Sequence, residues 1–310
     1  MSEIKNYDTV IIGGGIGGLM AAFRLRKNAP EMRIAITERG NTLEKRHCPA
    51  GKDKTCVHCK TCSITSGYAG AGAFSDGKFN LGTAYGGTLG EELGDDTANL
   101  YIDEVDKILN QYCTSGIPKV YRSNEELKLK CLQNNLRLLD MNVKHLGTDN
   151  NYLTMQNLIN AIAESGTDLF AFYDCVSVER DGNAYLLRYA NGETLRAQNI
   201  IIATGRGGAS FVADFCRMFD VKMRSNYVDI VRVEMKDIIW KEFSDQIYEP
   251  KILYKTKTFE DRCRMFCFNK GGLVSAENNH GIITANGHSF AEADKKTDNC
   301  NFAILSSIRF

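Results

Sequence analysis

The chain has 310 residues, which is long enough for two domains. Its 38 Lys and Arg residues balance its 38 Asp and Glu residues, so no global charge draws it to nucleic acid or to a membrane surface. The longest apolar run, Val10–Phe23, is too short and too rich in glycine to span a membrane. Acidic residues stand where a signal peptide would carry positive charge, which predicts a cytoplasmic protein. The 11 cysteines are then expected to be reduced thiols, ligands or redox groups and not disulfides.

The first predicted elements are a strand, a glycine turn and a helix. The strand Thr9–Ile12 leads into Gly13–Gly18, which carries the spacing G-x-G-x-x-G, and a helix is predicted over Leu19–Lys27. In such a turn the first glycine permits a tight bend, the second lets the backbone approach a pyrophosphate, and the third lets the helix pack on the strand. The helix N-terminus offers free N–H groups to the phosphates. We therefore predict a dinucleotide site that includes Gly13, Gly15, Ile16, Gly17 and Gly18.

A second strand, Arg33–Thr37, completes the βαβ unit and ends on an acid. Glu38 lies twenty residues after Gly18, where a carboxylate accepts hydrogen bonds from ribose hydroxyls. Arg39 follows it directly and is assigned to the same site. The turn and the acid suit the adenosine ribose of either FAD or NAD.

Residues 41–90 are rich in Cys, Gly, Ser and Lys and are predicted to form a long functional loop. Four cysteines, Cys48, Cys56, Cys59 and Cys62, lie within fifteen residues, the last three as C-x2-C-x2-C. This spacing is compatible with an iron–sulfur cluster, with a structural zinc site, or with a dithiol that exchanges electrons with a flavin. The sequence does not choose between these three, and a fourth interpretation gives the cluster no function.

Helices are expected over residues 91–139 and 152–165, where apolar residues recur at spacings near 3.6. The period then shortens, and strands are predicted over Phe170–Arg180, Tyr185–Tyr189 and Thr194–Arg196, joined by Asp-Gly-Asn and Asn-Gly turns. A buried strand, Asn199–Ala203, follows and is capped by Thr204-Gly205. This exit at a strand's carboxyl end is a place where ligands bind in open α/β folds, so Ala203, Thr204 and Gly205 join the predicted cofactor site.

Beyond Phe211 the pattern is mixed, with strands predicted over Tyr227–Met235, Ile252–Thr258, Gly272–Glu277, Gly281–Ala285 and Ile304–Phe310. We therefore expect an α/β fold in which a Rossmann-like domain with a β-meander is followed by a mixed α+β substrate domain. The expected boundaries are residues 1–90 and 166–212 for the first domain, 91–165 for a helical segment and 213–310 for the second domain.

The sequence also resembles a known family. The unit ending in Glu38-Arg39-Gly40, the meander and Ile202–Arg206 are similar to two-domain FAD enzymes of the glutathione-reductase-like superfamily. Five further segments are similar to the bacterial FAD-dependent dehydrogenase family: Gly70–Lys78, His145–Asp149, Thr256–Phe259, Phe266-Cys267 with Gly271-Gly272, and Asn286–Ser289. Relatives of this family normally continue to a C-terminal glycine–aspartate motif, so the chain is expected to be a truncated form.

The resemblance implies FAD as the cofactor and a hydride transfer through flavin N5. It places the glycine-rich stretch Gly67–Gly77 beside the flavin, with Gly72, Ala73, Ser75, Asp76 and Lys78 as contacts. Lys78, which could favour a reduced flavin electrostatically, and His288, a possible general acid or base, are the catalytic candidates. NAD(P)H is a possible electron donor, and the partners are expected to be a small-molecule substrate or an electron carrier, with no nucleic acid. A non-catalytic nucleotide-binding protein and an NAD-dependent dehydrogenase remain the alternatives.

Overall fold

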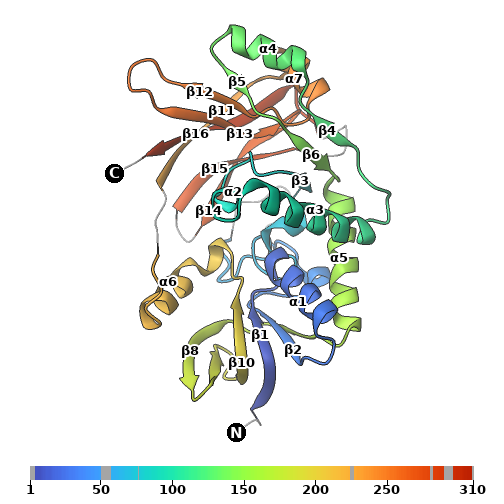
Figure 1. Ribbon diagram of the computed structural model, residues 1–310, viewed down its shortest axis with the longest axis vertical. Helices are drawn as coiled ribbons and strands as arrows, with labels where there is room; N and C mark the ends of the chain where they lie inside the picture. Colours follow the sequence, from blue (N-terminus) through green and yellow to red (C-terminus); the bar gives the residue numbers. More distant parts are fainter. Residues whose placement is uncertain are drawn as a thin grey trace. The chain divides into compact units, whose positions relative to one another are not determined.

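The computed structural model describes residues 4–49, 57–75, 77–223, 227–279, 282–289 and 296–308. The chain forms two compact units, and each is made of several segments that alternate along the sequence (Figure 1). Unit 1 comprises residues 1–75, 112–114 and 150–224, and unit 2 comprises residues 76–111, 115–149 and 225–310. No helix within the described residues has the length and apolar character needed to cross a lipid bilayer.

Unit 1 is built on a six-stranded sheet in the order β7-β2-β1-β10-β9-β8. Its strands are β1 (Lys5–Ile12), β2 (Ile34–Glu38), β7 (Asp168–Ala171), β8 (Cys175–Asp181), β9 (Ala184–Tyr189) and β10 (Thr194–Ile202). The first four strands of this order run parallel to one another, and β10, β9 and β8 continue as an antiparallel meander. This is the predicted α/β fold, with the meander joined directly to the parallel sheet.

Helices accompany this sheet because each carries an apolar stripe. Unit 1 holds α1 (Ile16–Asn28), most of α5 (Thr148–Glu164) and α6 (Ala209–Met218), with short 3-10 turns η1 (Leu43–Lys45), η2 (Gly70–Phe74) and η3 (Arg206–Gly208). The buried residues of α1 are Gly18, Leu19 and Ala22, and the helix contacts β1 and β2. Strand β2 is buried along its whole length and β1 is buried over Thr9–Ile12, as expected for parallel strands covered on both faces.

Unit 2 contains the remaining elements, built around a five-stranded antiparallel sheet in the order β11-β16-β13-β12-β5. The strands are β3 (Lys78–Asn80), β4 (Val120–Arg122), β5 (Arg137–Leu138), β6 (Asn142–His145), β11 (Tyr227–Lys236), β12 (Ile252–Lys255), β13 (Arg262–Asn269), β14 (Leu273–Asn279), β15 (Ile282–His288) and β16 (Asn299–Ile308). The helices are α2 (Leu89–Leu93), α3 (Asp95–Tyr112), α4 (Glu125–Gln133) and α7 (Lys241–Gln246), with the 3-10 turn η4 (Asp237–Ile239). Leu127, Phe268 and Phe302 belong to its core.

Three expectations about elements were wrong in detail. Phe170–Arg180 is two strands, β7 and β8, because the chain turns at Phe172, whose φ is +62°. The two predicted strands Thr194–Arg196 and Asn199–Ala203 are one strand, β10 (Thr194–Ile202). It pairs with β1 from Leu195 to Ile202 and also with β9 over Thr194–Ala197. The stretch 91–139 is interrupted by β4 and β5, which pair with strands distant in sequence.

The two units also divide the chain differently from the expected boundaries. The expected helical segment 91–165 is shared between them, since α3 belongs mainly to unit 2 and most of α5 to unit 1. Residues 77–90, expected in the first domain, belong to unit 2.

Candidate dinucleotide site

Three predicted segments of unit 1 meet at one edge of its sheet. The last residue of β1, Ile12, pairs with Thr37 of β2 on one side and with Ile202 of β10 on the other. The Gly13 N–H donates to the Thr37 carbonyl at 2.7 Å, and the Ala203 N–H donates to the Ile12 carbonyl at 2.8 Å. Because all three strands are parallel, their carboxyl ends bring the glycine turn, Glu38 and Thr204 to the edge where open α/β sheets bind ligands.

Two glycines of the fingerprint are required by the fold itself. Gly13 has a φ of +111°, a left-handed conformation that other residues rarely adopt, and a Cβ there would lie less than 3.0 Å from the Ala203 carbonyl. A Cβ on Gly18 would overlap the Gly13 carbonyl oxygen. Gly13 therefore makes the tight bend and Gly18 the close helix–strand packing that the spacing predicts.

Gly15 differs from both of these positions. It has an ordinary φ of −72°, and the nearest atom to a Cβ built on it is the Gly70 Cα, at 3.9 Å. The first turn of α1 holds no acidic residue, and no side chain caps its N-terminus. Within the described residues, the fold thus gives no internal reason for a glycine here. A phosphate that approaches the exposed N–H groups of α1 supplies one. Ile16, the first helical residue, is 43% exposed at the same place.

The Glu38 carboxylate organises three loops. Its Oε2 accepts a hydrogen bond from the Gly14 N–H at 2.8 Å, and its Oε1 accepts from the N–H groups of Gly40 and Gly67 at 2.9 Å each. The side chain is buried, with 7% of the residue exposed. A carboxylate has about four acceptor positions, so Oε2 keeps one for a further donor such as a ribose hydroxyl. The ribose contact predicted for Glu38 remains a prediction.

The glycine-rich loop is packed onto the turn. The Ala69 N–H donates to the Gly14 carbonyl at 2.8 Å, and the buried Tyr68 hydroxyl donates to the Ile36 carbonyl at 3.0 Å. A Cβ on Gly14 would lie 2.8 Å from the Tyr68 ring. This contact fixes the loop beside the site. Of the predicted contacts in it, Gly72 has open space, Ala73 is buried and Ser75 is exposed, while Asp76 lies outside the described residues.

Two side chains that sequence reasoning missed hold this loop. Buried Arg46 donates to the carbonyls of Ser63, Ile64, Tyr68 and Gly70, at 2.6–2.9 Å. Burial lowers the pKa of the Arg46 guanidinium to about 10, against the opposing effect of Glu38, so Arg46 stays charged at neutral pH. Asn151 of α5, 2% exposed, donates to the Gly72 carbonyl at 2.8 Å. No local motif marks either residue, because the carbonyls they bind belong to other segments.

The exit from β10 completes the edge. The Thr204 hydroxyl is buried and has no hydrogen-bond partner in the described structure, and Gly205 has a φ of +58° with open space around a built Cβ. Arg39 donates to the Ser66 hydroxyl at 2.9 Å and to the Gly207 carbonyl at 2.9 Å, so it ties the loop to this exit. An orphaned hydroxyl, an open glycine and uncapped helical N–H groups together fit the diphosphate and ribose of a dinucleotide such as FAD.

The cysteine cluster is only partly described. Cys48, Cys59 and Cys62 are exposed free thiols, and Cys56 lies outside the described residues. Burial opposes ionisation of the Cys62 thiol, but hydrogen bonds from Thr65 and Ile64 and the charge of Arg46 outweigh it and hold its pKa below the ordinary value. Within the described part of the chain, no group of three or more His, Cys, Asp or Glu side chains could hold a metal. The metal site remains a prediction.

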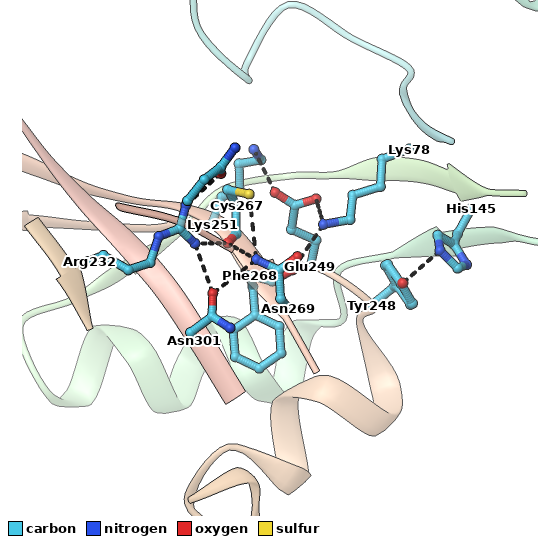
Figure 2. A network of polar contacts seen from close by, with 11 residues as sticks. Lys78, His145, Arg232, Tyr248, Glu249, Lys251, Cys267, Phe268, Asn269 and Asn301 are labelled. Carbon is cyan, nitrogen blue, oxygen red and sulfur yellow. Dashed lines mark hydrogen bonds and ion pairs between the residues drawn. The ribbon is translucent and has the colours of Figure 1, made fainter. Parts of the chain in front are cut away.

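The two catalytic candidates lie in unit 2. The Lys78 ammonium donates to the Phe268 carbonyl at 3.0 Å and lies 3.6 Å from the Glu249 carboxylate (Figure 2). Glu249 is also paired with the buried Lys251 at 3.0 Å. His288 ends β15 opposite Leu273, and the placement of its side chain is outside what the structure describes. Neither predicted catalytic role is tested by these positions.

The residues at the carboxyl end of the unit 1 sheet are those of a dinucleotide-binding α/β protein, and comparison with known proteins agrees with this class. A family model described as pyridine nucleotide-disulphide oxidoreductase matches residues 7–216. The chain therefore belongs to this family of FAD-dependent oxidoreductases, and it is an oxidoreductase by class. No curated protein matches its sequence.

Solved structures of oxidases and of a flavoprotein/dehydrogenase are similar to this chain only distantly. Glycine oxidase from Geobacillus kaustophilus is 13% identical, with a TM-score of 0.43 over 98% of this chain and 83% of its own. A flavoprotein/dehydrogenase from Cytophaga hutchinsonii is 13% identical, with a TM-score of 0.41 over 97% of this chain and 56% of its own. NikD, an unusual amino acid oxidase, is 12% identical, with a TM-score of 0.44 over 96% of this chain and 69% of its own.

Proposed function

We propose that the protein is an FAD-dependent dehydrogenase of the bacterial FAD-dependent dehydrogenase kind, acting on a small-molecule substrate in the cytoplasm. Bound FAD would supply two-electron chemistry at flavin N5, with NAD(P)H as a candidate donor and a second substrate or an electron carrier as acceptor. In this proposal unit 1 binds the cofactor. The candidate catalytic residues are Lys78, which would favour a reduced flavin electrostatically, and His288, which would act as a general acid or base. The protein's own part is to bind, to orient and to exclude water.

The observation that carries the proposal is Gly15. Its neighbours in the fingerprint, Gly13 and Gly18, are explained by contacts inside the fold, whereas the space beside Gly15 is open in the described structure. A backbone without a Cβ at the uncapped start of a helix lets a phosphate approach the N–H groups closely. The buried Thr204 hydroxyl has no hydrogen-bond partner in the described structure, and a bound ligand would supply one.

The residues around this turn have stated tasks in the proposal. The Glu38 carboxylate fixes Gly14, Gly40 and Gly67, and its remaining acceptor position would take a ribose hydroxyl. Arg46 holds the loop beside the turn through the Tyr68 and Gly70 carbonyls, and in this proposal it would limit the access of water to the diphosphate. Glu38 and Arg46 would therefore position the cofactor and take no part in the chemical step.

The proposal is tested with an absorbance spectrum of anaerobically purified protein and with the variant Gly15→Ala. Wild type should carry FAD in a one-to-one ratio. Gly15→Ala should lose most of it while keeping its fold, because the backbone angles at Gly15 suit alanine and the new Cβ meets only the space assigned to the phosphate. Far-UV circular dichroism and the thermal midpoint report the fold. Wild-type protein that ignores added FAD would overturn the proposal.

For the cysteine cluster, we propose that Cys48, Cys56, Cys59 and Cys62 serve one electron-transfer or metal function. Three forms stay open: an iron–sulfur cluster, a zinc site, or a redox dithiol. The low pKa of the Cys62 thiol suits a thiolate ligand and a redox thiol alike. Iron and zinc analysis of the anaerobic protein, with Cys62→Ser as the variant and the scattered Cys175→Ser as its control, separates them. A Cys62→Ser protein with unchanged metal content and turnover would reject all three forms.

A further inference from the structure

A polar cluster in unit 2 contains more hydrogen-bond donors than acceptors. Arg232 of β11 donates through Nη1 to the Cys267 carbonyl at 3.1 Å and to the Asn301 Oδ1 at 3.0 Å (Figure 2). Its Nη2 donates to the Asn286 Oδ1 at 3.5 Å. Asn269 donates to the Cys267 carbonyl at 2.9 Å and to the Asn301 Oδ1 at 3.2 Å. All the acceptors of Arg232 among the described residues are therefore neutral.

Two buried donors in this cluster lack an acceptor. The Arg232 Nε and the Asn301 Nδ2 are shielded from solvent and have no hydrogen-bond partner among the described residues, and Asn301 is 0% exposed. No carboxylate within the described part of the chain forms an ion pair with Arg232. An unpaired buried donor costs about 1–3 kcal/mol, and a guanidinium costs more when no negative charge compensates it. The cluster as it stands is incomplete.

The backbone is shaped to build this cluster. The pairing of β13 with β16 shifts register between Phe266 and Asn269, and Cys267 within that bulge has a left-handed φ of +51°. As a result two consecutive carbonyls accept from different cations, Cys267 from Arg232 and Phe268 from Lys78. Bulges and left-handed non-glycine residues are concentrated at functional sites, where they redirect polar groups.

The β15 strand lies directly on the cluster. A Cβ on Gly287 would overlap the Asn301 and Asn269 amides and would lie 2.5 Å from the Arg232 Nη1. Glycine is required here because the polar groups occupy the position of a side chain. Arg232 and Asn286 are each partly exposed to solvent, although the Nε atom of Arg232 is itself buried.

The charge around the cluster favours an anion. Arg232, Lys78 and Lys251 are three cations near the bulge, and the Glu249 carboxylate is shared by the two lysines. The Nε–Nη2 edge of Arg232 has only the 3.5 Å contact with Asn286 as a partner, and this edge of a guanidinium binds a carboxylate through two parallel hydrogen bonds.

We infer that Arg232, with Asn301 and Asn286, is a binding site for a carboxylate group, and that the substrate of this enzyme is a carboxylate-bearing compound. The assignment of the carboxylate to a substrate rests on the proposed function. The carboxylate site itself rests only on the contacts of unit 2. Arg232 is the specificity-determining residue in this assignment, and the two asparagines orient it.

The test is calorimetric titration of the purified full chain with acetate, succinate and benzoate, and with the matching amides. Wild type should bind at least one carboxylate saturably and its amide not at all. Arg232→Gln should weaken that binding about ten- to a hundredfold, the effect of losing hydrogen bonds to a charged group. Arg232→Lys keeps the charge but loses Nε, so its affinity for the carboxylate should lie between those of wild type and Arg232→Gln. It also replaces Arg232→Gln in the test if that variant fails to fold. The control is Arg188→Gln, which removes an exposed arginine of unit 1.

Equal carboxylate binding by wild type and Arg232→Gln would overturn the inference, as would the failure of all three carboxylates to bind wild type. The FAD content of each sample is read separately from its absorbance. Carboxylate binding that depends on Arg232, in a wild-type protein that does not bind added FAD, would therefore support this site while rejecting the proposed function.

Discussion

At the scale of single residues, the glycine turn separates fold from function. Gly18 allows α1 to touch the Gly13 carbonyl, and Gly15 has no internal neighbour that forbids a side chain. Glycine-to-alanine changes within one motif should therefore act differently. Only Gly18 lies inside α1, where alanine favours a helix by about 1 kcal/mol over glycine.

We expect Gly18→Ala to destabilise the protein by about 1–3 kcal/mol or more, because overpacking against backbone outweighs the gain in helix propensity. The free energy of unfolding, measured by denaturant titration without FAD, checks this. Gly15→Ala is the matched control and should unfold like wild type. If Gly18→Ala were as stable as wild type, the close packing at Gly13 would not matter energetically.

Glu249 is the second residue with a defined consequence. Burial raises the pKa of its carboxyl, but the charges of Lys78 and Lys251 outweigh burial and hold the pKa below the ordinary value. A carboxyl with a lowered folded-state pKa stabilises the protein above its unfolded-state pKa, and this stability is lost as the pH falls through the folded value. The loss should begin near pH 4.5 and continue below it.

Glu249→Gln should cost about 3–5 kcal/mol at pH 7, because it leaves two lysines beside a neutral amide in a buried position. It should also flatten the decline of stability below pH 4.5, measured by denaturant unfolding at several pH values. Glu260→Gln is the control, since it removes an exposed partner of Lys255 and should leave the unfolding midpoint unchanged. An acid decline equally steep in Glu249→Gln would show that other carboxyls cause it.

The sequence predicts the residues of the turn but not those that support it. The spacing of Gly13, Gly15 and Gly18 was enough to predict the turn, because glycines at this spacing allow a tight bend and the close approach of other groups to the backbone. Arg46, Asn151 and Glu249 were missed, since each is defined by partners that other segments bring to it. The signal available for Arg46 was only its place in a loop rich in glycine.

At the scale of elements, Arg46 holds the loop from Ser63 to Gly70 in one conformation. Four carbonyls of this loop accept from a single guanidinium, and Gly67 has no room for a side chain beside it. A lysine has one ammonium and cannot reach four carbonyls at once.

Arg46→Lys should therefore loosen the loop while leaving the sheet intact, at about 1–3 kcal/mol for each buried carbonyl left unsatisfied. We expect faster proteolysis within residues 57–75 and weaker FAD binding, measured by timed digestion with mass spectrometry and by flavin titration. Arg217→Gln, at an exposed helical pair, is the control and should change neither. Unchanged protection of the loop in Arg46→Lys would mean that other contacts hold it.

Element boundaries were predicted where local pattern decides them and failed where pairing decides them. The turns of the meander and the strands β11, β12, β14 and β15 were confirmed closely. β10 was predicted as two strands because its polar residues at Gln198 and Asn199 interrupt the apolar pattern, although the backbone pairs on both sides of them. The bulge in β13 has no local signal, since a register shift is a property of two strands.

At the scale of the whole molecule, the α/β class and a first domain made of two separate segments were predicted. The sequence did not predict that residues 76–111, 115–149 and 225–310 form one unit. Composition and length indicate two cores, and each unit has one, around Leu187 in unit 1 and Phe268 in unit 2. Which segment joins which core depends on long-range contacts. As a result α3 and α5, which overlap the same predicted helical segment 91–165, belong mainly to different units.

The proposed FAD site therefore lies in unit 1, and the proposed carboxylate site lies in unit 2. FAD should slow amide hydrogen exchange at residues 13–18, 66–75 and 203–208 of unit 1, the segments that converge on the sheet edge. At a free concentration one hundredfold above its dissociation constant, it should stabilise the folded state by about 2.7 kcal/mol. Gly15→Ala should abolish both effects, whereas Arg232→Gln should leave both in place. Hydrogen exchange read by mass spectrometry, with and without FAD, measures this. Protection by FAD that survives in Gly15→Ala would move the cofactor away from the glycine turn, since binding energy must follow the contacts that produce it.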